Sequence, residues 1–134
     1  MGRAGGKMKM RTFILFTMLA LVLGAAVWEQ VYIDNTIKSL QVMGNQLYIE
    51  LQDEDINTSK QIVNNINNYW NKRQTFISLM VDFRDIESIG RQCNYIMANL
   101  NNNDFELART ECLQFNYVVQ NFANMTHFDV HNIF

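Results

Sequence analysis

Two cysteines and two histidines are the most reactive side chains in this chain of 134 residues, and all four lie after residue 92. Cys93 and Cys112 stand almost symmetrically about Asn102 and Asn103, where a turn between two helices is expected. Each also falls on an apolar stripe with helical spacing. The pattern therefore predicts that the two side chains meet at one height of a helical hairpin.

Two interpretations of the cysteine pair stay open. An oxidising compartment favours a disulfide, which the loop-entropy model values at about 3 kcal/mol. Packed helices have axes about 8–10 Å apart, near the upper limit of disulfide Cα separations. The other interpretation is a pair of reduced core residues, like Gly44 and Val63 in the preceding hairpin. A catalytic thiol is not expected, because a nucleophile needs a nearby base and access to solvent.

The histidines belong to a tail in which His127, Asp129 and His131 alternate with Phe128 and Val130. In an extended tail, alternate side chains share one face, and these three would form a candidate Zn²⁺ site with an open position. The other interpretation is a tail whose apolar side chains pack on the helices.

Other sequence motifs of catalysis are missing. The chain has no Gly-rich phosphate loop, no HExxH, no CxxC and no nucleophile elbow. We interpret residues 53–55, all acidic, as a solvated turn, and Tyr69 and Trp70 as rim and core. We therefore expect neither an enzyme nor a bound cofactor.

The elements that position these residues are predicted to be helices. Apolar residues recur at alternating steps of three and four, and the chain contains no proline. The pattern repeats at an offset of 49 residues, with a short polar turn between two stripes in each copy. The stripes of the first copy are Ile37, Leu40, Gly44, Leu47, Leu51 and then Ile56, Ser59, Val63, Ile66, Trp70. Those of the second are Ile86, Ile89, Cys93, Ile96, Leu100 and then Phe105, Ala108, Cys112, Phe115, Val119.

Each copy is predicted to form an αα-hairpin. Asp55 and Asp104 hold the same place in the two copies, where a side-chain oxygen can cap the second helix. The fold class is therefore all-α, with hairpins at about 35–75 and 76–124 and a tail at 125–134. The third helix is expected to begin near Gln74.

An apolar run from Thr12 to Trp28 precedes this domain and follows a basic leader, residues 1–11. We interpret residues 12–32 as an uncleaved transmembrane helix that continues into the domain at 33–134. Cationic flanks stay cytoplasmic, so the domain is expected outside the cytoplasm. The alternative is a signal peptide cleaved after Gly24-Ala25-Ala26, followed by secretion.

Acidic and basic residues are distributed differently on the two sides of this apolar run. Four of the eleven basic residues precede Thr12, whereas all thirteen acids follow Trp28, so the outer part has a net charge near −6. We expect no nucleic-acid partner for such a domain, since phosphate contacts need clustered Lys and Arg. The same balance argues against a domain that lies flat on anionic lipid.

Several segments resemble one known family. They are Trp70, the stretch Leu79-Met80-Val81-Asp82, Asp85, Ile86, Ile89 and the terminal Asn132-Ile133-Phe134. The chain is similar to small single-pass membrane proteins of Gram-positive, clostridia-like bacteria that share a domain of unknown function. The resemblance implies an N-terminal anchor and an all-helical outer domain of about 100 residues. It implies no biochemical activity.

Three functions are compatible with these features. The first is a membrane-anchored protein of the bacterial cell envelope that works by protein–protein interaction, since helical hairpins commonly serve as binding surfaces. The second is an extracytoplasmic helical bundle that senses a small ligand and signals through a partner. The third is a thiol- or metal-dependent enzyme. We favour the first, because nothing in the sequence supplies reactive chemistry.

Overall fold

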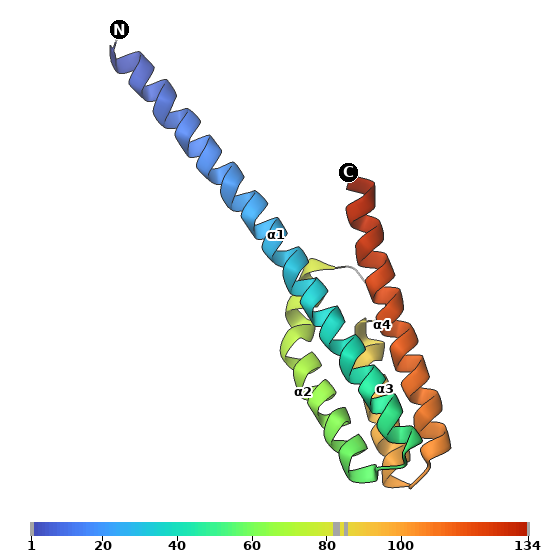
Figure 1. Cartoon of the computed structure of the whole chain (residues 1–134). Coiled ribbons are helices and arrows are strands. Elements are labelled where there is room, and N and C mark those ends of the chain that lie inside the picture. Colours follow the sequence, from blue (N-terminus) through green and yellow to red (C-terminus); the bar gives the residue numbers. More distant parts are fainter. Residues whose placement is uncertain (1, 82–83, 85, 134) are drawn as a thin grey trace. The chain divides into compact units, whose positions relative to one another are not determined.

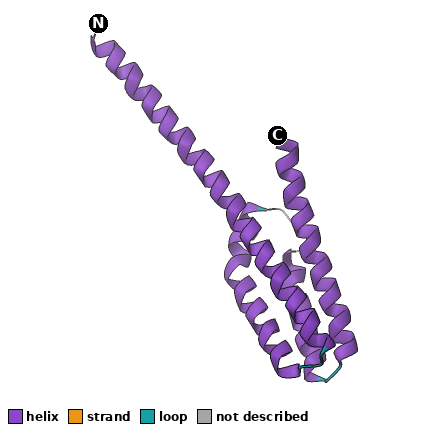
Figure 2. Ribbon diagram, viewed as in Figure 1, coloured by secondary structure: helices purple, strands orange, loops and turns teal. Residues whose placement is uncertain are grey.

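A computed structural model describes residues 2–81, 84 and 86–133, and the side chains of residues 9–81, 84 and 86–126. All regular structure in these residues is helical (Figure 2). The helices are α1 (Gly2–Gln52), α2 (Ile56–Met80), α3 (Ile86–Asn101) and α4 (Phe105–Ile133) (Figure 1). The chain divides into two compact units, Met1–Ile33 and Asp34–Phe134. The family residues Asp82 and Asp85 lie outside the described part.

The first unit consists of the N-terminal part of α1. Its large apolar side chains from Met10 to Val31 are exposed, and α1 includes the one described helix that is long and apolar enough to cross a membrane. A signal sequence near an N-terminus has the same properties. Trp28 and Tyr32 stack at the end of this segment, with ring centroids 5.6 Å apart.

The second unit has a core built from the predicted stripes. Every stripe residue is buried except Ile56 and Phe105, which are half-buried at the starts of α2 and α4. α3 packs against both α2 and α4. The largest fully buried side chains are Trp70, Phe115 and Phe122. The predicted all-α fold of packed helices is therefore confirmed, and Trp70 is confirmed as a core residue.

The two turns have the same hydrogen bonds at the 49-residue offset. Glu54 and Asn103 both adopt left-handed backbone, with φ of 55° and 56°. Each of these residues donates its N–H to the carbonyl three residues back, at 3.2 and 3.0 Å. The next residue, Asp55 or Asp104, donates to the carbonyl five residues back, at 3.1 and 2.9 Å. This is a Schellman arrangement, which satisfies carbonyls that a helix end would otherwise leave unpaired.

Both predicted aspartate caps are confirmed. Asp55 accepts the backbone N–H of Thr58 at 3.1 Å and the Thr58 hydroxyl at 2.8 Å. Asp104 accepts the N–H of Leu107 at 3.1 Å. The hydrogen bonds from Thr58 stabilise the carboxylate and lower the pKa of Asp55 below its usual range.

Two predicted boundaries are wrong. The third helix does not begin near Gln74, because α2 continues to Met80 and α3 begins at Ile86. Ile77 is fully buried as part of α2, so packing extends that helix by one more turn. The tail is not extended either, since α4 continues to Ile133.

Gly44 allows α1 and α4 to approach closely. Its carbonyl accepts the Cys112 thiol at 3.6 Å and the Asn116 side-chain amide at 3.5 Å. A Cβ at this position would lie 3.0 Å from the Phe115 ring and would also collide with Asn116. Gly90 differs, because a Cβ there would meet only Trp70, at an ordinary 3.8 Å.

We therefore expect opposite effects from two glycine substitutions. Gly44→Ala should lower the free energy of unfolding by about 1–3 kcal/mol, because the buried Phe115 ring cannot yield. Gly90→Ala should raise it by about 0.5–1 kcal/mol, because alanine favours a helix interior and its methyl group fits. Urea unfolding of the full chain in detergent would measure both. Equal effects would contradict the close approach at Gly44.

The left-handed turn residues give a second prediction. Glu54→Gly should stabilise the protein by about 1 kcal/mol, since glycine adopts positive φ without the steric cost of a Cβ. Asn103→Gly is the matched control and should gain less, because asparagine tolerates this conformation. Thermal unfolding of both variants would provide the comparison. A destabilised Glu54→Gly variant would show that the turn has a different conformation.

Candidate functional site

The two cysteines lie where the sequence predicts, in the core of the second unit. Both are buried, and neither is bonded to another sulfur. The thiols are close enough for the charge of Cys93 to affect the titration of Cys112. The Cys112 thiol donates to the Gly44 carbonyl across the α1–α4 contact. A disulfide between Cys93 and Cys112 remains a prediction.

Burial makes both thiols unreactive. Desolvation raises the pKa of Cys93 from 9.0 to about 12. Desolvation, and then the neighbouring Cys93, raise the pKa of Cys112 from 9.0 to about 12. The thiolate is the nucleophilic form of cysteine, and at neutral pH these groups remain protonated. The arrangement is that of core residues.

The candidate zinc ligands fall in the last turns of α4. The side chains of His127, Asp129 and His131 lie outside the described part of the chain. Their backbone is helical, and residues two apart on a helix point in different directions. The extended geometry on which the site depended is therefore not formed. In the side chains that the structure does describe, no three His, Cys, Asp or Glu residues gather as a metal site would require.

A polar groove between α2 and α3 was not found by sequence reasoning. Its walls are formed by Asn67, Asn71, Gln74, Glu87, Arg91 and Asn94, with Gly90 between them. The absence of a side chain at Gly90 brings the groove close to the buried indole of Trp70. The Trp70 indole nitrogen makes no hydrogen bond with a described residue. The only sequence signal was the helical spacing of the asparagines, which also suits an ordinary solvated face.

The outer face of α4 carries two large apolar side chains one turn apart. Leu113 is 53% exposed and Tyr117 is 62% exposed. Residues at i and i+4 on a helix lie side by side, so the two side chains form one patch. Polar side chains surround it on the same helix, including exposed Gln114. We call Leu113 and Tyr117 the α4 patch.

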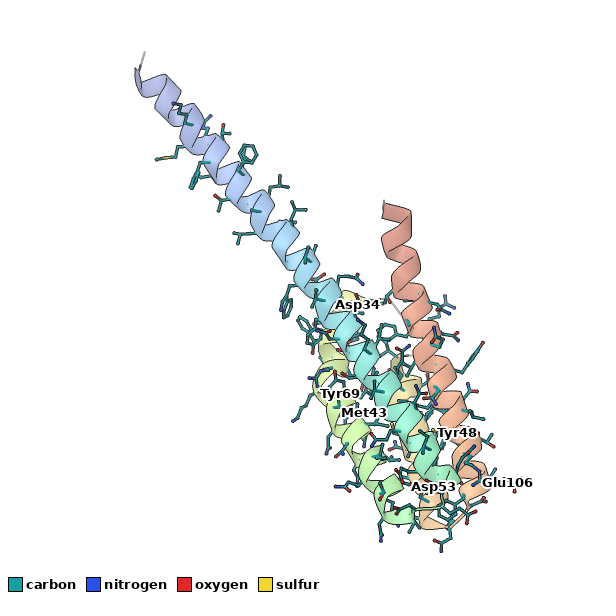
Figure 3. All side chains as sticks on the ribbon, viewed as in Figure 1. Asp34, Met43, Tyr48, Asp53, Tyr69 and Glu106 are labelled. Carbon is teal, nitrogen blue, oxygen red and sulfur yellow. The ribbon has the colours of Figure 1, made fainter. Side chains whose placement is uncertain are left out.

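The turns of the second unit form an acidic end. Arg109 crosses between them, donating to the Leu51 carbonyl at 3.2 Å and lying 3.9 Å from the Glu54 carboxylate. Figure 3 shows Asp53 and Glu106 at this end and Asp34 at the opposite one. Glu54 and Asp55 are exposed, as expected of a solvated turn.

Comparison with known proteins places this all-α domain in a family. A model of a domain of unknown function, DUF4363, matches residues 27–133. The chain belongs to the DUF4363 family. The match includes the whole second unit apart from its last residue, whereas the apolar segment before residue 27 lies outside it. No curated protein and no solved structure matches the chain.

The thiols of this DUF4363 domain should make its stability depend on alkaline pH. The unfolded chain releases each thiol proton near pH 9, whereas the folded chain holds it to about pH 12. Stability is therefore fully present below about pH 9 and falls as pH rises toward 12, by about 1.4 kcal/mol per pH unit for each thiol.

Urea unfolding under reducing conditions, from about pH 8 to about pH 10.5, would measure this dependence. The matched control is the double variant Cys93→Ala, Cys112→Ala, whose stability should fall less steeply over the same range. The two proteins differ only at these two positions, so the difference between their curves reports the contribution of the thiols. Parallel curves would show that the thiols are accessible to solvent in the folded state.

Proposed function

We propose that this protein is a single-pass membrane protein of the bacterial cell envelope that acts by binding another protein. The observation that supports it most directly is the run of exposed apolar side chains from Met10 to Val31, in a chain whose residues from Asp34 onward form a second compact unit. Such a run is stable only when lipid or another apolar surface covers it. The basic residues before Thr12 orient the N-terminus toward the cytoplasm and the domain outward.

The binding surface in this proposal is the α4 patch. Tyrosine is common among residues that dominate interface energies, because its ring contributes large contact area and its hydroxyl remains hydrogen-bonded. Leu113 and Tyr117 are exposed while the cysteines are buried and protonated. The surface therefore offers contact area rather than a nucleophile, and we propose no catalytic role.

Photocrosslinking in native membranes tests this proposal. A photoreactive amino acid replacing Gln114, beside the α4 patch, should yield one dominant crosslinked protein identified by mass spectrometry. Leu113→Ala and Tyr117→Ala should each reduce that product strongly, since truncation of an interface anchor costs about 2 kcal/mol or more. Both changes are at exposed positions and should alter stability by no more than about 0.5 kcal/mol.

Cys93→Ala and Cys112→Ala serve as controls and should leave the product intact once protein levels are matched. Loss of function in either variant, with the protein folded and abundant, would contradict a binding-only role. The purified protein should also keep its basic leader. A mature N-terminus just after Ala26 would show that the apolar segment is a cleaved signal peptide. The protein would then be secreted rather than anchored.

A second candidate function has one observation in its favour. The α2–α3 groove carries four side-chain amides, a carboxylate and a guanidinium, and it lies close to Trp70, whose indole nitrogen makes no hydrogen bond with a described residue. Such a set of donors and acceptors suits a small polar ligand, and the domain would then act as a sensor through a partner. Saturable chemical-shift changes at Asn67, Asn71 and Asn94 on addition of a polar ligand would favour this function over the first.

A further inference from the structure

α2 differs from the rest of the second unit in its charge. Its 25 residues contain Lys60, Lys72 and Arg73 but no aspartate or glutamate. The unit as a whole is acidic, because twelve of the thirteen acids of the chain follow Ile33. α2 is therefore a basic helix in an acidic domain.

The last turns of α2 also expose apolar surface. Leu79 is 81% exposed, more than any other large apolar side chain that the structure describes, and Phe76 is 37% exposed. Lys72 is exposed one turn before Phe76. Arg73 lies over the Tyr69 ring, 3.6 Å from its centroid. Exposed apolar residues beside cations, without acids, are typical of helices that contact a lipid surface. We call Lys72, Phe76 and Leu79 the α2 tip.

The α2 tip lies at the end of the unit where the chain enters. α1 and α2 run in opposite directions from the turn at residues 53–55. From that turn, α1 extends about 28 Å back to Asp34, whereas α2 extends about 37 Å to Met80. The α2 tip therefore lies at the end of the unit opposite the turns, where Figure 1 shows the last turns of α2. Asp34 directly follows the apolar segment.

The two ends of the unit differ in charge. The turn end, residues 50–60 and 102–111, holds seven acids and two bases. Outside these two ranges, the sequence of the unit holds five bases, at residues 38, 72, 73, 84 and 91, and five acids. Anionic headgroups therefore repel the turn end more strongly than the rest of the unit.

We propose that the α2 tip rests on the membrane surface, with Leu79 and Phe76 at the boundary of headgroups and acyl chains and Lys72 among the headgroups. This inference rests on the proposed membrane anchor, because the anchor keeps the end that contains Asp34 close to the bilayer. The domain thus stands on its α2 tip, with its acidic turns directed away from the lipid. Such a contact is compatible with an acidic composition, since only one end of the domain meets the lipid.

Site-directed fluorescence in vesicles tests the contact. The full chain is reconstituted into phosphatidylcholine–phosphatidylglycerol vesicles in which some lipids carry a doxyl quencher, near the headgroup for the dyes at residues 79 and 107 and near the end of the acyl chain for the dye at residue 22. An environment-sensitive maleimide dye is attached to Leu79→Cys, to Leu107→Cys at the turn end, or to Val22→Cys in the apolar segment. The native cysteines are 2% and 0% exposed, and unsubstituted protein should incorporate no dye.

The dye at residue 79 should emit at shorter wavelength than the dye at residue 107 and be quenched several-fold more strongly. Lys72→Glu should weaken the quenching at residue 79, whereas Lys60→Glu, on the same helix near the turn end, should not. Equal quenching at residues 79 and 107 would overturn the contact. A dye at residue 79 that is shielded from water but not quenched would also overturn it, because protein would then cover the tip.

The dye at residue 22 separates this inference from the anchor on which it rests. Quenching at residue 22 without quenching at residue 79 would reject the surface contact and leave the anchor in place. No quenching at residue 22 would reject both.

Discussion

The second unit depends on two chain reversals of the same design. At Glu54 and again at Asn103, one residue in left-handed backbone ends a helix, and the aspartate after it caps the next one. Because the two turns have equal length and equal hydrogen bonding, they bring each apolar stripe opposite its partner in the same register. The core residues Leu51 and Leu100 each lie just before a turn and are fully buried. A change in the length of either turn would rotate the following stripe away from the core.

The register that these turns impose also decides what the reactive side chains can do. It places Cys93 and Cys112 inside the unit, where loss of hydration keeps both thiols protonated. It brings Gly44 against α4, where its carbonyl accepts hydrogen bonds from Cys112 and Asn116. Both thiols are therefore part of the packed core. The surface features on the described residues include the α4 patch and the α2–α3 groove.

The negative charge of the second unit is concentrated at its turn end. Such a distribution suits a domain whose other end is attached to a bilayer. The Asp34 end joins the apolar segment. Seven of the unit's twelve acids lie at the turn end, whereas five of its seven bases lie outside it. Repulsion between acids and anionic headgroups would hold the turns away from the lipid. The α4 patch lies along the side of the unit, so a protein partner and the membrane need not compete for the same residues.

The features that the sequence by itself determined depend only on residues that are close together in the chain. Spacing of three and four residues defined the four stripes, and the type of side chain at Asp55 and Asp104 defined the caps, because both are properties of a single helix or helix end. The first apolar segment was equally clear from composition.

Tertiary packing decided the rest. The boundary between α2 and α3 was misplaced because no proline or glycine marks it, and burial of Ile77 decides which helix includes that segment. The tail alternates over only five residues, and α4 instead continues past Thr126, which is still buried. The groove beside Trp70 and the contact at Gly44 depend on which edges of two stripes meet. That choice depends on all the helices together, so no local pattern in the sequence could reveal it.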